Sequence, residues 1–121
     1  MEIFNVQNIY AGYKYPEEFM KVVDLNLIDL DLWYFMPEKQ VEDRINGLKD
    51  RYPKRKLIPF ARRDDCDDIA CFEVGKGNKV QIIHDFSSVG WEQRKEYDSF
   101  WSWFKDAVEE MIREDEEENN R

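Results

Sequence analysis

Residues 57–72, LIPFARRDDCDDIACF, contain two short apolar runs on either side of a cluster of aspartates. Leu57, Ile58 and Phe60 are predicted to lie in one strand, and residues 69–72, IACF, in the next. Because the connection between them is short, the two strands are expected to pair antiparallel. The turn between these core strands then carries Asp64, Asp65, Asp67 and Asp68.

Two helices that begin with proline are predicted before this stretch. The first begins at Pro16, and the second begins at Pro37 and ends at Pro53. Proline suits the first turn of a helix because its missing N–H group would have no helical partner there. Between these helices, residues 28–36 alternate between apolar and polar side chains, which predicts a single half-buried strand. One further short strand is expected within residues 1–15.

A strand, a loop and a helix are predicted after the aspartate turn. Gly75–Asn78 is typical of a hairpin turn that joins the IACF strand to a strand over residues 79–86. Residues 87–95 are polar and are expected to form a loop. The last helix is predicted over residues 98–113, with Asp98 as its N-cap. Its apolar face is expected to consist of Phe100, Trp101, Phe104, Val108, Met111 and Ile112.

The order of these elements predicts one α+β domain. The 121 residues, of which 42% are hydrophobic, are enough for a single core. Short connections between strands favour an antiparallel sheet of about four to six strands, flanked by helices. The domain is expected to span residues 1–113, and residues 114–121, EDEEENNR, are expected to form a solvated acidic tail.

The net charge of the chain is −9, which bears on the partners it can bind. Nucleic acid and an anionic membrane would both repel such a chain, whereas a basic protein would be attracted to it. The same acidity is also explained by solubility alone. The N-terminal segment has no signal-peptide pattern, and the apolar runs are far shorter than a membrane span. A cytosolic protein, or one delivered without a signal of its own, is therefore expected.

The aspartates at residues 64–68 have three interpretations: a metal site, a solvated turn or a contact surface. Calcium and magnesium need several converging oxygen ligands, which carboxylates supply. The calcium-loop pattern requires a glycine after the acids, where this chain has Ile69 and Ala70. Arg62 and Arg63 also neutralise part of the charge. The turn and contact-surface interpretations are therefore favoured over a metal site.

The two cysteines, Cys66 and Cys71, do not form a zinc-binding pattern. A structural zinc site needs four ligands, and the chain has a single histidine, His84. Cys71 lies within an apolar run and is predicted to be a small core residue.

His84 and Asp85 form the one pair that resembles a general base with its acid. Catalysis would also require a positioned nucleophile, for which Ser87 and Ser88 are the nearby candidates. The chain has neither a nucleophile-elbow motif nor a glycine-rich phosphate loop. A histidine at the rim of a strand is the preferred interpretation, and no enzyme activity, metal or cofactor is predicted.

The tryptophans divide into core candidates and interface candidates. Trp101 is expected to lie in the core, and Trp103 near the edge of the helical apolar face. Trp91 lies in the predicted loop beside Glu92, where it is either an interface anchor or a loop-packing residue. The candidate partner-binding residues are Asp64, Asp65, Asp67, Asp68, Trp91 and Glu92.

Five segments occur in a characteristic order: YPEEF at 15–19, LIPFA at 57–61, Asp68 with Phe72, His84–Asp85, and SFWSWF at 99–104. In this order they resemble the SUKH superfamily, which includes yeast Smi/Knr-type cell-wall regulators and many bacterial immunity proteins. The resemblance covers residues 15–112. The resemblance implies an antiparallel α+β fold without shared catalytic residues. It also implies a binding role, which in many bacterial members is the neutralisation of a toxin, often a nuclease.

Three hypotheses of function follow. The leading one is a cytosolic immunity protein that neutralises a basic toxin, because an acidic domain complements the basic surface with which a nuclease holds phosphates. The second is a regulatory or scaffolding module that binds a protein of its own cell. The third is a metal-dependent hydrolase that uses the aspartates at residues 64–68.

Overall fold

Six antiparallel strands form an open sheet in which each strand pairs with its neighbours in sequence. The computed structural model describes residues 1–120. The strands are β1 (Asp29–Leu30), β2 (Trp33–Phe35), β3 (Leu57–Arg63), β4 (Asp68–Glu73), β5 (Val80–His84) and β6 (Gln93–Tyr97). Because all connections join adjacent strands, the sheet is a meander, and the predicted α+β fold with an antiparallel sheet is confirmed.

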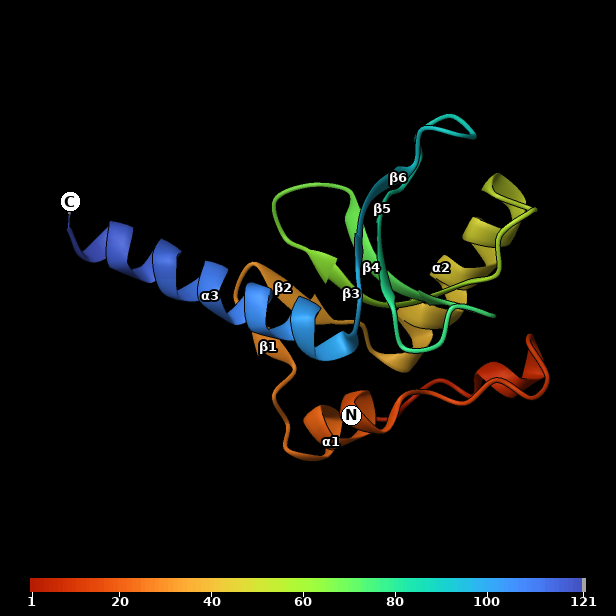
Figure 1. Ribbon diagram of the computed structural model, residues 1–121, viewed down its shortest axis with the longest axis horizontal. Helices are drawn as coiled ribbons and strands as arrows, with labels where there is room; N and C mark the ends of the chain where they lie inside the picture. The colour runs from red at the N-terminus through yellow and green to blue at the C-terminus, as the bar shows by residue number, and fades with distance from the viewer. Residues whose placement is uncertain (121) are drawn as a thin grey trace.

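Helices cover both faces of this sheet (Figure 1). They are α1 (Glu17–Asp24), α2 (Glu38–Arg51) and α3 (Phe100–Asn119), with a short 3-10 helix at Val6–Asn8. Side chains of α1 and α3 share one buried cluster with the sheet, to which Ile45 of α2 also belongs, and Leu48 of α2 packs in a second cluster on the opposite face. Both proline-led helices therefore form where the sequence predicts them.

Aromatic rings fill the core between the sheet and the helices α1 and α3. Phe60 of β3 and Phe72 of β4 stack with their ring centroids 4.4 Å apart. Phe19 of α1 lies 5.6 Å from Phe72, and Phe100 of α3 lies 5.8 Å from Phe60. Such aromatic pairs contribute about 0.5–1.5 kcal/mol beyond the burial of their area. The LIPF and IACF runs thus hold both helices against the sheet.

The opposite face of the sheet packs against α2. The cluster on this face consists of Leu48, Tyr52, Leu57, Ile69, Cys71 and Ile83. Cys71 is fully buried, as predicted, and burial raises the pKa of its thiol well above the usual value. Cys66 is exposed in the β3–β4 turn, and both cysteines are free.

The single strand predicted over residues 28–36 is wrong, because the segment folds as the hairpin of β1 and β2. Asp31 has a φ of 71°, and its backbone N–H donates to the Asp29 carboxylate at 3.0 Å. This turn inverts the alternation of the side chains, so Trp33 and Phe35 are buried in the core. An aspartate tolerates the left-handed conformation better than most residues do.

Two other predictions at the level of elements are also wrong. The predicted loop over residues 87–95 ends in an edge strand, β6, whose sequence QRKEY is polar because most of its side chains face water. Residues 1–15 form no strand and contain only the 3-10 helix at Val6–Asn8.

The last helix is rotated relative to the prediction. Trp103 is buried at 1% exposure, whereas Trp101, predicted to lie in the core, is 44% exposed. Ser99 caps the helix by accepting from the Ser102 backbone N–H at 3.1 Å, in place of the predicted Asp98. The helix also continues through Asn119, so residues 114–119 of the predicted tail are helical and exposed.

Candidate protein-binding site

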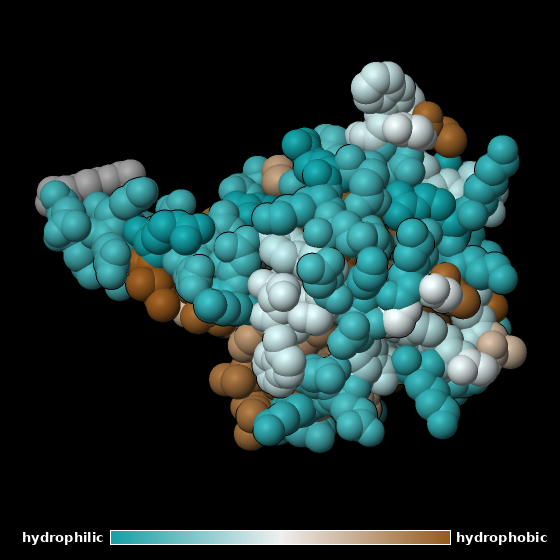
Figure 2. Space-filling view, viewed as in Figure 1, coloured by the Kyte–Doolittle hydropathy of each residue, from teal (hydrophilic) through white to brown (hydrophobic). Residues whose placement is uncertain are grey.

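The connection between β5 and β6, residues 85–92, exposes three large apolar side chains. We call this segment the β5–β6 loop. Phe86, Val89 and Trp91 are 62%, 69% and 80% exposed. The loop projects from the upper end of the sheet in Figure 1, and pale and brown groups gather at its tip in Figure 2. Three large exposed apolar side chains within one short loop make this segment a candidate interaction site.

The carboxylate of Asp85 fixes the start of the loop to α2. Its side chain is completely buried, and it accepts hydrogen bonds from Arg51 Nε and Nη2 at 2.8 Å and from Arg44 Nη1 at 2.9 Å. The backbone N–H of Phe86 donates to the same carboxylate at 2.8 Å. A buried carboxylate needs hydrogen-bond donors and positive charges of this kind, because a buried carboxylate without a partner would be strongly unfavourable.

Gly47 of α2 leaves space for the Arg51 side chain in this contact. A Cβ atom at this position would lie 2.7 Å from Arg51 Nη1 and 2.9 Å from Nη2. The glycine therefore leaves room for the guanidinium group to lie along the helix toward Asp85. A glycine within a helix lowers the stability of the helix by about 1 kcal/mol relative to alanine. Here the glycine also provides the space that the Arg51 side chain occupies.

Tyr52 fixes the middle of the loop. Its hydroxyl donates to the Ser87 carbonyl at 2.7 Å, and the Trp91 N–H donates to the Ser88 carbonyl at 2.9 Å. Burial raises the pKa of Tyr52, and the nearby Asp85 carboxylate raises it further. The hydroxyl is thus a proton donor to the loop at neutral pH.

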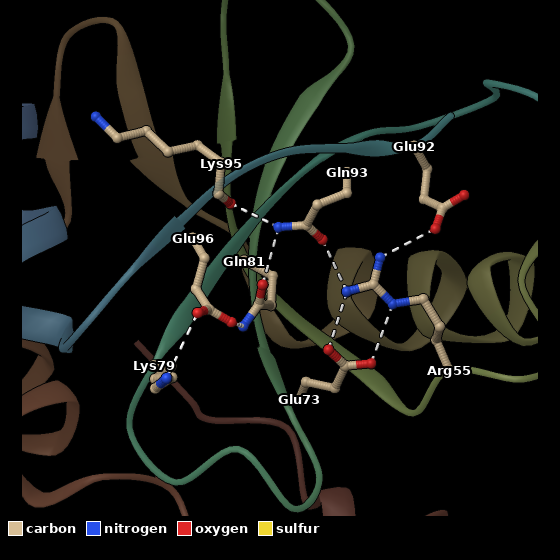
Figure 3. A network of polar contacts seen from close by, with 8 residues as sticks. All are labelled: Arg55, Glu73, Lys79, Gln81, Glu92, Gln93, Lys95 and Glu96. Carbon is tan, nitrogen blue, oxygen red and sulfur yellow. Dashed lines mark hydrogen bonds and ion pairs between the residues drawn. The ribbon is translucent and has the colours of Figure 1, made fainter. Parts of the chain in front are cut away.

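Glu92 fixes the end of the loop (Figure 3). Its carboxylate accepts from the Gly90 N–H at 2.7 Å and from Arg55 Nη1 at 3.0 Å. Arg55 also forms a two-pronged ion pair with Glu73 at 2.9 and 3.0 Å. Burial opposes ionisation of Glu92, but backbone N–H groups and Arg55 prevail, so its pKa lies below the usual value.

The loop therefore presents its apolar side chains from a fixed backbone. Phe86 has a φ of 69°, a conformation that aromatic residues rarely adopt. The guanidinium of Arg51 lies 4.2 Å from the centroid of its ring. A surface that is ordered before binding loses less conformational entropy when a partner binds.

The aspartate turn lies at the same end of the sheet as this loop. Asp68 pairs with His84 across β4 and β5, and the Asp85 N–H donates to the Asp67 carbonyl at 3.1 Å. The structure thus brings the sequence-predicted aspartates and Trp91 to one end of the molecule. Asp64, Asp65 and Asp67 are exposed there, and Asp68 is half-buried.

Two of the four aspartates are already paired within the protein. Asp65 binds Arg63 at 2.8 and 2.9 Å, and this hydrogen bonding lowers the pKa of Asp65. Asp68 lies 2.8 Å from both His84 Nδ1 and Arg94 Nε. Within residues 1–120, Asp64 and Asp67 form no side-chain ion pair, and no three acidic, histidine or cysteine side chains are grouped as metal ligands.

His84 is half-buried at the end of β5, which agrees with its predicted place at the rim of a strand. Its ring contacts the Asp68 carboxylate. Among the described residues, its ring forms no hydrogen bond to Ser87 or Ser88. These residues therefore do not form a linked nucleophile and base. Glu92, predicted as a partner-binding residue, is buried and bound to Arg55 within the protein.

The sequence analysis did not identify Asp85 as an anchor or Val89 as an exposed apolar residue, and it placed residue 86 at the end of the predicted strand over residues 79–86. The spacing of Arg44 and Arg51 is a sequence pattern that indicates a shared partner for the two arginines. They are seven residues apart and so lie on one face of α2. Other exposed apolar side chains include Leu25 and Leu27 in the connection between α1 and β1, and Trp101 and Ile112 in α3.

Comparison with known proteins found no matching family model, no similar curated protein and no similar solved structure. None of the helices in residues 1–120 combines the length and the apolar character that crossing a membrane requires.

Proposed function

We propose that this chain is a non-enzymatic, cytosolic protein-binding domain that neutralises a bacterial toxin. The observation that carries the binding function is the β5–β6 loop, which holds Phe86, Val89 and Trp91 in water at 62%, 69% and 80% exposure. Tryptophan and other aromatic side chains dominate the binding energy of many protein interfaces. The loop protrudes, so its complement is a recess on another protein.

The exposed aspartates near the loop favour a basic partner. Asp64 and Asp67 lie exposed at the same end of the sheet and have no internal ion pair among the described residues. The whole chain carries a net charge of −9. Complementary charge accelerates association and disfavours acidic proteins as partners.

The assignment of the partner as a toxin rests on the SUKH-like segments together with this acidity. A nuclease toxin has a basic active site because it binds phosphates, and an acidic domain with apolar anchors is suited to cover it. Neutralisation then requires only that this chain cover the active site of the toxin, without catalysing a reaction.

Co-expression with the protein encoded by the adjoining gene tests this function. We expect the two proteins to co-purify and the chain to protect cells from the adjoining gene product. Co-purification with an endogenous regulator, without protection from any toxin, would contradict neutralisation and favour a regulatory module.

The aspartates provide a second test of the same interface. Replacing Asp64 and Asp67 with asparagine is expected to weaken binding to the toxin by about tenfold at low salt, with little change in stability, because both side chains are exposed. The matched control, Glu117→Gln with Glu118→Gln in α3, removes the same charge at a distant surface. Equal weakening by both double variants would show that net charge alone, rather than this turn, determines binding.

A further inference from the structure

A second feature of the surface is a cavity between α2, β3 and the start of the β5–β6 loop. Its volume is about 260 Å³. The side chains that matter for its chemistry are Met36, Gln40, Arg44, Arg51, Arg62 and Phe86. We propose that this cavity, which shares Phe86 with the β5–β6 loop, binds a small organic carboxylate, a ligand different from the protein partner proposed for the loop.

The cavity concentrates positive charge in an acidic protein. Three guanidinium groups line it, whereas the carboxylates that face them are the buried Asp85 and, at the rim, Asp43. Asp43 also pairs with Lys39 at 3.1 Å. At least one positive charge is therefore in surplus, in a chain whose net charge is −9.

The arginines also retain hydrogen-bond donors for a ligand. Arg44 binds Asp85 only through Nη1, and Arg51 binds it through Nε and Nη2. Arg62 has no ion pair within residues 1–120 and packs 5.4 Å from the ring centroid of Tyr34. The fork of N–H groups on a guanidinium matches the two oxygens of a carboxylate.

The buried Asp85 makes the site rigid. Because its carboxylate holds both Arg44 and Arg51, two of the three guanidinium groups are ordered before a ligand arrives. Little side-chain entropy then remains to be lost on binding. This order distinguishes the cavity from a surface on which arginines move freely.

The rest of the cavity indicates what else the ligand carries. Met36 and the exposed ring of Phe86 provide apolar walls, which suit a short carbon skeleton better than an inorganic anion. The volume lies below the range of about 300–1,000 Å³ that drug-sized ligands occupy. The occupant is therefore a small organic acid.

Nuclear magnetic resonance titration of the full chain tests this site with defined probes. Benzoate supplies a carboxylate on an apolar ring, benzamide has the same shape without the charge, and inorganic phosphate is an anion without an apolar part. We expect saturable shifts of the Arg44, Arg51 and Arg62 Nε–Hε signals with benzoate, and markedly weaker binding of the other two probes.

Variants assign the binding to this cavity. Arg62→Gln is expected to weaken benzoate binding roughly fivefold or more, and Arg62→Lys, which keeps the charge, by a smaller factor. Arg113→Gln, the same change on α3, is expected to have no effect. Amide spectra confirm that each variant is folded.

Three results would overturn the proposal. Equal binding of benzamide would mean that the cavity recognises only an apolar ring, and tighter binding of phosphate would mean that it does not select organic acids. Unchanged benzoate binding in Arg62→Gln would place the ligand elsewhere. None of these results depends on whether the β5–β6 loop binds a toxin, because the titration contains no partner protein.

Discussion

At the scale of single residues, Asp85 connects the fold to the candidate site. Its buried carboxylate joins α2 to the β5–β6 loop through Arg44 and Arg51 and also accepts from the Phe86 backbone. Removing one partner from a buried ion pair typically costs about 3–5 kcal/mol. Here both arginines are partly exposed, so water can solvate them once the carboxylate is gone.

The replacement Asp85→Asn is therefore expected to lower the free energy of unfolding by about 2–3 kcal/mol, somewhat less than for a fully buried pair. Denaturant-induced unfolding at neutral pH measures the effect. The control Asp43→Asn breaks an exposed pair with Lys39 and is expected to cost under about 0.5 kcal/mol. A cost for Asp85→Asn no greater than for Asp43→Asn would exclude Asp85 as an anchor.

Gly47 offers a double-mutant test of the space it leaves for Arg51. Gly47→Ala is expected to stabilise the protein by about 1 kcal/mol in an Arg51→Ala background, where only helix propensity changes. In the natural sequence the gain is expected to vanish, because the new Cβ would lie 2.7 Å from Arg51 Nη1. Unfolding measurements on the four proteins of the cycle give the coupling. Equal gains in both backgrounds would mean that Arg51 moves aside without cost.

The pattern of apolar residues predicted the core strands correctly, but it did not predict which aromatic side chains of the last helix are buried. Phe100, Trp101, Trp103 and Phe104 all fall within residues 100–104, so apolar spacing alone fits more than one rotation of the helix. Packing against the sheet selects Trp103, whose ring lies 5.6 Å from that of Trp33. Contacts of this kind are non-local, and a single sequence does not contain them.

At the scale of elements, the β5–β6 loop depends on anchors at its start, middle and end. The sequence predicted a polar loop and identified Trp91 within it. It did not predict the edge strand β6, because the residues of this strand are polar. The turn between β1 and β2 was missed for a related reason, since Asp31 reaches a positive φ without a glycine. Both errors arise where backbone pairing, rather than side-chain alternation, determines structure.

Glu92 gives the loop a predictable dependence on pH. Because its folded pKa lies below the ordinary glutamate value of about 4.3, its carboxylate stabilises the protein fully above that value. This contribution is lost as the pH falls through the folded pKa. We expect Glu92→Gln to lower the free energy of unfolding by about 2 kcal/mol at pH 7, and by less at pH 3.

Unfolding curves between about pH 7 and pH 3 measure this convergence. Glu109→Gln is the control, because Glu109 is an exposed residue of α3, 4.0 Å from Lys105. If the difference between Glu92→Gln and the natural protein stays constant over this range, ionisation of Glu92 does not stabilise the loop.

At the scale of the whole molecule, the sequence was sufficient for the α+β class and for the two core strands around the aspartate turn. It predicted the helices that begin after Pro16 and Pro37, because proline and apolar spacing act locally. It was insufficient for the candidate site, since Asp85 meets Arg44 and Arg51 only when β5 packs against α2. The aspartates, although prominent in the sequence, are in part internal ion-pair partners.

At the same scale, the net charge of −9 and the exposed β5–β6 loop support the proposal that this domain binds a basic protein through the loop. The acidic turn and the loop lie at the same end of the sheet, and Trp101 lies beyond the opposite end of β6. The two exposed tryptophans, Trp91 and Trp101, are therefore a matched pair for locating the interface.

The affinity of Trp91→Ala and Trp101→Ala for the co-purified toxin, measured by calorimetry, tests this account most directly. Loss of a tryptophan anchor typically costs about 2 kcal/mol or more, so we predict that Trp91→Ala binds roughly 30-fold more weakly. Trp101→Ala is predicted to change the affinity less than about twofold. Unchanged affinity for Trp91→Ala, or an equal loss for Trp101→Ala, would contradict binding through the β5–β6 loop.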